Sequence, residues 1–236
     1  MPTAAFDEVL DRLDTAARQA RQPRPRLLAV SKFQPATAVA QLAAAGQRAF
    51  GENYVQEAAA KREALAGLDL EWHLIGHLQT NKARDAAALF DWVQTVDRIR
   101  VVEALARHRP THLPPLQVLV QVNIDDEASK HGCRPDDVAG LAEAMAGHER
   151  LALRGLMVIP TPHADPEQRR PAFRRTRELF EALRRHHPQA DTLSMGMSDD
   201  CAVAIAEGAT MVRIGTALFG ARPPKSDADA GMPGSG

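Results

Sequence analysis

The sequence has few cysteines and no clear excess of charge of either sign, and each absence excludes a class of protein. Its two cysteines, Cys133 and Cys201, are far apart and lack metal-ligand spacing. This spacing argues against a disulfide framework and favours a reducing, cytoplasmic location. The formal net charge is −1 at pH 7, so the overall charge gives no reason to expect a nucleic acid or an acidic membrane surface as a partner.

Long hydrophobic runs are also missing. No apolar segment approaches the roughly 20 residues that span a bilayer. The first residues contain Asp7, Glu8 and Asp11 where a signal peptide would have a basic segment followed by an apolar one. Residues 223–236 are mostly Pro, Gly, Ser, Ala and Asp, which bury too little apolar surface to offset the entropy of ordering. We therefore expect one domain over residues 1–222 and a disordered tail over 223–236.

Short apolar runs alternate with helical patterns along the chain. An amphipathic helix is expected first, with an apolar face of Phe6, Val9, Leu10, Leu13 and Ala17. Strands are predicted at residues 26–31, 48–50, 71–75, 92–96, 116–122, 153–158, 192–195 and 211–214. Helices are predicted at residues 36–45, 55–66, 81–89, 98–107, 135–146, 166–185 and 199–207.

Eight β units, each followed by a helix or a helical turn, predict a single-domain α/β fold, a (β/α)8 barrel of the TIM type. Several strands are apolar on both faces, as expected for parallel strands covered by helices. An open doubly wound sheet is the alternative. No G-x-G-x-x-G turn follows the first predicted strand, which favours the barrel.

The candidate site consists of polar residues where predicted strands end, because these ends meet at one mouth of a barrel. Lys32 ends the first strand. A partly desolvated lysine favours the neutral amine, which can attack an aldehyde. A lysine that simply extends its ammonium group to solvent is the alternative. Further residues at or near strand ends are Asn53, His77, Asn123, Met157, Met195 and Arg213.

Two turns near the end of the chain suggest a phosphate site. Ser198 is a predicted N-cap whose helix begins at Asp199, and the backbone amides there form an anion site. The amides of Gly215 and Thr216, after the eighth strand, can face the same point. Ordinary helix capping, with Asp199 and Asp200 at the positive end of the helix dipole, is the alternative. Both turns together, opposite Lys32, favour phosphate.

Two other patterns in the sequence do not predict a further functional site. His73 and His77 are four residues apart but lie on a strand and a loop, so no zinc site is predicted from them, and none is expected elsewhere. The predicted helix at 166–185 is rich in arginine, and we expect a solvated basic face in preference to an RNA or acidic-partner surface.

Six ordered motifs carry a family resemblance that extends from about Leu27 to Arg222. They are LLAVSK, FGENYVQE, WHLIGHLQTNK, GLMVIP, LSMGMSDD and MVRIGTALFGAR. In these motifs the chain resembles the pyridoxal phosphate homeostasis protein family. The resemblance implies a barrel like the N-terminal domain of alanine racemase, with pyridoxal 5′-phosphate (PLP) bound as a Schiff base to Lys32.

The resemblance also implies roles for the other site residues. Ser198 and the amides of Gly215 and Thr216 are expected to hold the phosphate, and Arg213 to approach the pyridine nitrogen or the phosphate. Asn53 is expected near the cofactor ring. His77, Met157 and Met195 are expected to form pocket walls.

Two functions agree with this resemblance. The first is a monomeric cytoplasmic carrier in vitamin B6 homeostasis, which buffers PLP and supplies it to apo-enzymes, without nucleic acid or membrane partners. The alternative is an amino-acid racemase or decarboxylase. Barrel racemases take a second base, a tyrosine, from an added C-terminal domain. Here the chain ends about twenty residues after the last predicted strand, and its only tyrosine is Tyr54. We therefore expect a carrier without catalytic residues.

Overall fold

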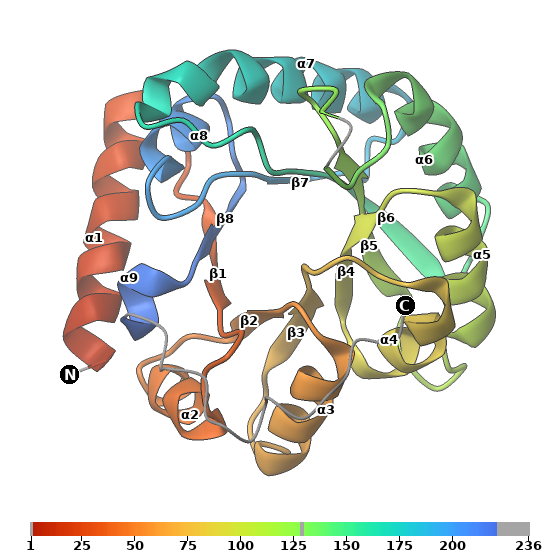
Figure 1. Ribbon diagram of the computed structural model, residues 1–236, viewed down its shortest axis with the longest axis horizontal. Helices are drawn as coiled ribbons and strands as arrows, with labels where there is room; N and C mark the ends of the chain where they lie inside the picture. Colours follow the sequence, from red (N-terminus) through yellow and green to blue (C-terminus); the bar gives the residue numbers. More distant parts are fainter. Residues whose placement is uncertain (1, 128–129, 221–236) are drawn as a thin grey trace.

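Eight parallel strands close into a barrel and follow one another around it in chain order (Figure 1). They are β1 (Arg26–Val30), β2 (Ala49–Glu52), β3 (Glu71–Leu74), β4 (Trp92–Val96), β5 (Leu116–Val122), β6 (Leu151–Val158), β7 (Thr192–Ser194) and β8 (Met211–Ile214). The computed structural model describes residues 2–127 and 130–220, so the predicted tail lies outside the described residues. The predicted (β/α)8 barrel is confirmed, and the open sheet is excluded because β1 pairs with β8.

Helices surround the barrel in the expected positions (Figure 1). They are α1 (Pro2–Ala20), α2 (Ala36–Ala44), α3 (Val55–Ala64), α4 (Ala83–Leu89), α5 (Ile99–His108), α6 (Val138–Ala146), α7 (Arg170–His186), α8 (Cys201–Ala206) and α9 (Thr216–Phe219). Short 3-10 turns at Thr80–Lys82, Pro135–Asp137 and Pro166–Arg169 precede α4, α6 and α7. The prediction was wrong at α8, which begins at Cys201 and not at Asp199.

The N-terminal helix α1 completes the outer ring. It packs against α2, α8 and α9 (Figure 1), and α9 is a single turn of four residues. Phe6, Val9, Leu13 and Ala17 are buried in the core, as its amphipathic pattern predicts. Each larger apolar side chain stabilises such packing by roughly 1.5–3 kcal/mol. Helix α1 therefore covers the part of the barrel that the short α9 leaves open.

Side chains along each strand point alternately outward to the helices and inward, so the barrel has an outer core and a separate interior. The outward residues join one large apolar core with the helices. Two smaller apolar clusters are separate from it, one formed by Trp92, Leu119 and Met157 and one that contains Leu28 and Met211. The buried polar residues His73, Gln94, Ser194 and Arg213 lie on the same alternation as these clusters. The expectation of strands apolar on both faces holds for β1, whose Leu27 and Ala29 join the outer core and whose Leu28 joins an inner cluster, while other strands also carry polar residues inward.

Among the residues that the structure describes, none of the helices has both the length and the apolar character needed to cross a bilayer.

A backbone irregularity in β6 provides a test of the fold. The register between β5 and β6 shifts between Val118 and Leu119. Leu119 is paired with Gly155, which has φ +141°. A Cβ at Gly155 would lie 2.0 Å from the carbonyl oxygen of Thr192. We expect Gly155→Ala to lower the free energy of unfolding by roughly 2–5 kcal/mol, from overpacking and backbone strain together. Urea unfolding measures this loss.

The matched control is Gly140→Ala in α6, where an added Cβ meets nothing within 4 Å. Replacing a helical glycine with alanine should stabilise the protein by roughly 0.5–1 kcal/mol. Similar unfolding curves for the two variants would contradict the close packing of Gly155 against Thr192.

Candidate functional site

The closure of the barrel brings the two ends of the candidate site together. In the β1–β8 ladder, Leu28 is opposite Arg213 and Ala29 is opposite Ile214. Lys32, partly buried and two residues beyond β1, therefore lies at the same barrel end as Gly215, which directly follows β8. The carboxyl ends of barrel strands form the usual ligand-binding face of this fold.

The turn after Lys32 has an unusual backbone conformation. Phe33 has φ 62°, a left-handed conformation that costs a residue with a Cβ roughly 1–2 kcal/mol. Its amide donates a 2.5 Å hydrogen bond to Glu57 Oε1, and its ring contacts Tyr54 with centroids 5.7 Å apart. These contacts offset the strain and fix the peptide that follows Lys32.

A buried ion-pair cluster holds the residue on the other side of Lys32. Lys61 Nζ donates to the carbonyl oxygen of Ser31 at 2.6 Å and to the carboxylates of Glu52 and Glu57, each at 2.7 Å. Ser31 Oγ also donates to Glu52 at 2.5 Å. Burial raises the pKa of Glu52, and the charge of Lys61 opposes that rise. This cluster connects the Lys32 turn to β2 and α3, and its residues were not predicted as part of the site.

Arg213 places a buried cation inside the barrel. Its guanidinium donates to Ser194 Oγ and to the carbonyl oxygen of Val158, both at 2.8 Å. Burial lowers the pKa of Arg213 to about 10, and the charge of Asp200 partly opposes that shift. Arg213 therefore remains charged at neutral pH. Within residues 2–127 and 130–220 it makes no ion pair, so its position favours an anionic ligand group.

A chain of hydrogen bonds runs from Arg213 through the barrel interior. Ser194 Oγ donates to Gln94 Oε1 at 2.7 Å, and Gln94 Nε2 donates to His73 Nδ1 at 2.9 Å. His73 Nε2 then donates to Glu71, since burial lowers the pKa of His73 and keeps its ring neutral. Each donor points away from Arg213, so the orientation of Arg213 is coupled to the opposite end of the barrel.

The turn between β7 and α8 differs from the prediction. Ser198 is half-buried and lies in the turn before α8, but it is not the N-cap. That position belongs to Asp200. Asp200 is buried, accepts a 2.6 Å hydrogen bond from the Met197 amide and pairs with Arg169 at 2.6 Å. The ion pair with Arg169 neutralises the negative charge of Asp200, which would otherwise disfavour a phosphate in this turn.

The predicted basic face is only partly solvated. Arg169 is buried, and the arginines at 170, 174 and 177 surround the carboxylate of Glu207, which is itself buried. Arg175 pairs with Asp125 at 3.3 Å. The structure thus uses much of this positive charge within the molecule, where the prediction had expected solvent.

Asn53, Met157, Met195 and Asn123, which were also predicted near the site, occupy different environments. Asn53 packs closely against Gly76 after β3. A Cβ at Gly76 would lie 2.1 Å from the carbonyl oxygen of Asn53, so Gly76 allows the β2 and β3 ends to approach closely. Met157 is fully buried in the inner cluster, whereas Met195 belongs to the outer core. The side chain of Asn123 donates to the carbonyl oxygen of Glu127 at 2.8 Å and so holds the loop after β5.

Three more of the predicted residues lie near the mouth. Gly215 directly precedes α9, and an added Cβ there would lie 3.3 Å from the carbonyl oxygen of Val30 on β1. Thr216 is exposed. His77 is also exposed, and its ring stacks on His131, so it does not pair with His73.

Comparison with known proteins identifies the family. The family model described as alanine racemase, N-terminal domain, matches residues 6–223. The pyridoxal phosphate homeostasis protein of Pseudomonas aeruginosa is 54% identical over 209 residues, which are 89% of this chain and 87% of that protein. The chain belongs to the pyridoxal phosphate homeostasis protein family. The resemblance predicted from the six sequence motifs is therefore confirmed.

Two further comparisons agree over nearly the whole chain. The pyridoxal phosphate homeostasis protein of Escherichia coli is 50% identical over 220 residues, which are 91% of this chain and 94% of that protein. The structure of PipY from Synechococcus elongatus, solved with PLP bound, matches with a TM-score of 0.81 and 37% identity. The match covers 93% of this chain and all of PipY.

Glu71, where the hydrogen-bond chain from Arg213 ends, predicts a pH-dependent stability of the protein. Burial alone raises the pKa of Glu71, but the bond from His73 and the Arg26 guanidinium at 2.7 Å outweigh it and hold the pKa at about 2. This lies below the roughly 4.3 of an unfolded glutamate. The stabilisation is therefore present above about pH 4.3 and is lost as pH falls through about 2.

We expect the stability advantage of the wild type over Glu71→Gln to shrink between about pH 6 and about pH 3. Urea unfolding of both proteins at each pH measures this change. Glu149→Gln, which changes an exposed glutamate, is the control and should differ from the wild type equally at both pH values. A pH-independent difference for Glu71→Gln would contradict the assigned bonding of Glu71.

Proposed function

We propose that this chain is a PLP carrier in vitamin B6 homeostasis and that it binds the cofactor as a Schiff base on Lys32. The observation that carries the proposal is the position of Lys32, at the barrel mouth beside the end of β8 and between two residues fixed by the buried ion-pair cluster. The names of the curated relatives and the PLP-bound structure of PipY support the choice of cofactor.

The donor set fits this cofactor. PLP supplies an aldehyde that an amine can capture, together with a phosphate and a pyridine nitrogen. Arg213 offers a buried positive charge without an ion pair in the described residues, which suits either the phosphate or the ring nitrogen. We assign Ser198, Gly215 and Thr216 to the phosphate and Asn53 to the ring. Met157 remains a proposed pocket wall, whereas Met195 lies in the outer core and His77 lies across the mouth from the β8–β1 seam, so neither is retained in the proposed pocket.

Two other lysines are less suitable amines. Lys61 is buried and donates to three oxygens of the ion-pair cluster. Lys130 pairs with Glu127 at 3.0 Å and donates to Thr161 at 2.8 Å. Lys61 lies on α3 and Lys130 lies in the loop after β5, so neither stands beside the end of β8 as Lys32 does.

The carrier proposal extends to partners and location. The curated relatives are named homeostasis proteins and not enzymes. We propose a monomer that supplies PLP to apo-enzymes in the cytoplasm, and the free buried thiols of Cys133 and Cys201 fit a reducing compartment. A racemase would need a second base. The one tyrosine of the sequence, Tyr54, has its ring against Phe33 in the Lys32 turn.

Borohydride trapping tests the attachment site. Protein incubated with PLP should show the visible absorption of a Schiff base, and borohydride should convert this linkage into a stable amine. Peptide mapping is expected to find the added mass on the peptide that contains Lys32. Lys32→Ala should lose both the absorption and the label, because the remaining lysines lack this position.

Lys82→Ala is the matched control, since Lys82 lies at the same barrel end after β3 and should retain the label pattern of the wild type. A label on Lys130 or elsewhere, with Lys32 unmodified in the native protein, would contradict the assignment.

A comparison of two ligands tests the phosphate contacts. Ser198→Ala and Arg213→Gln should each weaken the binding of PLP about tenfold or more relative to unphosphorylated pyridoxal, since a charge-assisted bond contributes roughly 1.5–3 kcal/mol. Equilibrium titrations of both ligands measure the ratio. If Arg213 contacts the ring nitrogen, its variant should also shift the absorption spectrum.

The control variant is Arg107→Gln, which changes an exposed arginine on α5 and should leave both affinities unchanged. Equal losses for the two ligands in both site variants would remove Ser198 and Arg213 from the phosphate site.

A further inference from the structure

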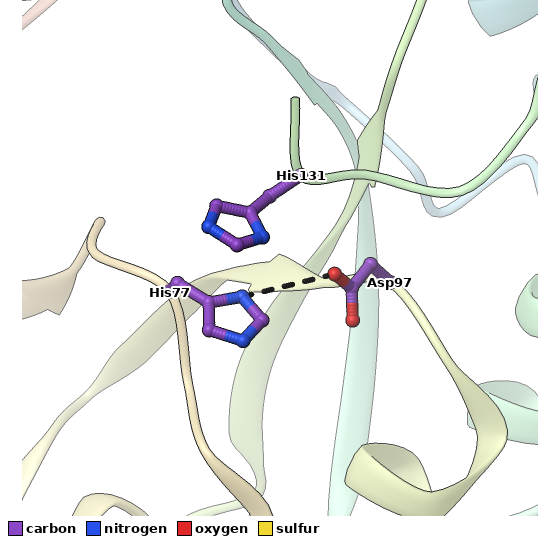
Figure 2. Close-up of side chains that lie close together, drawn as sticks. All are labelled: His77, Asp97 and His131. Atoms are coloured by element: carbon purple, nitrogen blue, oxygen red, sulfur yellow. Dashed lines mark ion pairs between the residues drawn. The ribbon is translucent and has the colours of Figure 1, made fainter. Parts of the chain in front are cut away.

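Three side chains from separate loops meet at the barrel mouth (Figure 2). His77 follows β3, Asp97 directly follows β4, and His131 lies in the loop after β5. Their candidate ligand atoms all lie within 4.8 Å of one another, and His77 Nδ1 is 3.9 Å from Asp97 Oδ2. The two imidazole rings stack with centroids 3.9 Å apart. Residues distant in sequence thus place two nitrogens and one carboxylate around a common point.

The carboxylate is oriented by its surroundings. Only 10% of the Asp97 side chain is exposed. Arg98 Nη1 donates to Oδ1 at 2.5 Å, while Oδ2 faces His77. Arg98 is itself held by a 2.9 Å bond to the carbonyl oxygen of Leu78. Such outer contacts fix the direction of a ligating carboxylate, although the charge of Arg98 opposes a bound cation.

The two imidazoles are open to a metal ion. His77 and His131 are both exposed, and each offers a ring nitrogen to the common point. Because His131 lies on an exposed loop, it can move to bring the ligand atoms to the closer spacing set by metal bonds of about 2.0–2.1 Å.

We propose that His77, Asp97 and His131 form a binding site for a divalent transition-metal ion of the Zn²⁺ type. Two imidazoles and one carboxylate favour such ions over Ca²⁺ and Mg²⁺, which prefer oxygen ligands. Three protein ligands leave at least one coordination position for water or another ligand. The site lies across the mouth from the β8–β1 seam that carries Lys32, and it does not depend on the proposed PLP function.

Isothermal titration of ZnCl₂ into the full chain, freed of metal and without an affinity tag, tests the proposal. One Zn²⁺ per chain is expected, both with and without PLP bound. His77→Ala, Asp97→Asn and His131→Ala should each weaken Zn²⁺ binding at least tenfold, because each removes one of three ligands. His112→Ala, which changes an exposed histidine outside the cluster, is the control and should bind as the wild type does.

Spectroscopy distinguishes this site from other metal binding. Cu²⁺ bound in the same place should show coupling to two imidazole nitrogens by electron paramagnetic resonance, and His131→Ala should remove one of them. His131 is exposed, so its variant should keep the wild-type melting temperature. Unchanged Zn²⁺ affinity in His131→Ala, or binding of Mg²⁺ as tight as that of Zn²⁺, would overturn the proposal.

Discussion

The backbone pairing between β1 and β8 is the constraint on which the candidate site depends. These strands lie at opposite ends of the described chain, and four registered residue pairs from Arg26 to Ala29 join them. The pairing removes both sheet edges and brings Lys32 beside the turn at Gly215. An open sheet would separate the proposed amine from the proposed phosphate turn, so the chemistry of this mouth requires a closed ring.

Five polar residues of the barrel form a series in which each has a partner, so their burial costs little. Arg213, Ser194, Gln94, His73 and Glu71 are connected in series, so no member of this series relies on solvent. An isolated buried guanidinium would be strongly unfavourable, whereas one fixed by two hydrogen bonds keeps its charge and a defined direction. The interior therefore acts as a rigid support for the cation at the mouth.

Much of this architecture could be predicted from the sequence. Three strands, among them β4 at Trp92–Val96, have the predicted bounds, because local apolar patterns determine them. The error at Ser198 arose because the cap was assigned from residue type, whereas the buried pair of Asp200 with Arg169 determines where α8 begins. The second strand was predicted at residues 48–50 and lies at Ala49–Glu52.

Contacts between distant loops could not be predicted. Lys61 appears in the sequence as an ordinary helical lysine, and nothing local shows that it is buried against Ser31. The grouping of His77 with Asp97 and His131 depends on the geometry of three neighbouring strand ends. The alternation of inward and outward positions along the strands could have indicated the buried hydrogen-bond chain. Its members His73, Gln94, Ser194 and Arg213 all occupy inward positions.

The packing of α1 has a consequence for how the protein is made. Its apolar face is covered by α8 and α9, which begin about 180 and about 200 residues after α1 ends (Figure 1). Arg12 of α1 also bonds the carbonyl oxygen of Ser198 at 2.9 Å. At translation rates of roughly 5–20 residues per second, α1 waits on the order of 10–40 s for these partners. During that time Phe6, Val9 and Leu13 are available to chaperones, and the ring of helices is completed only when the last strand has left the ribosome.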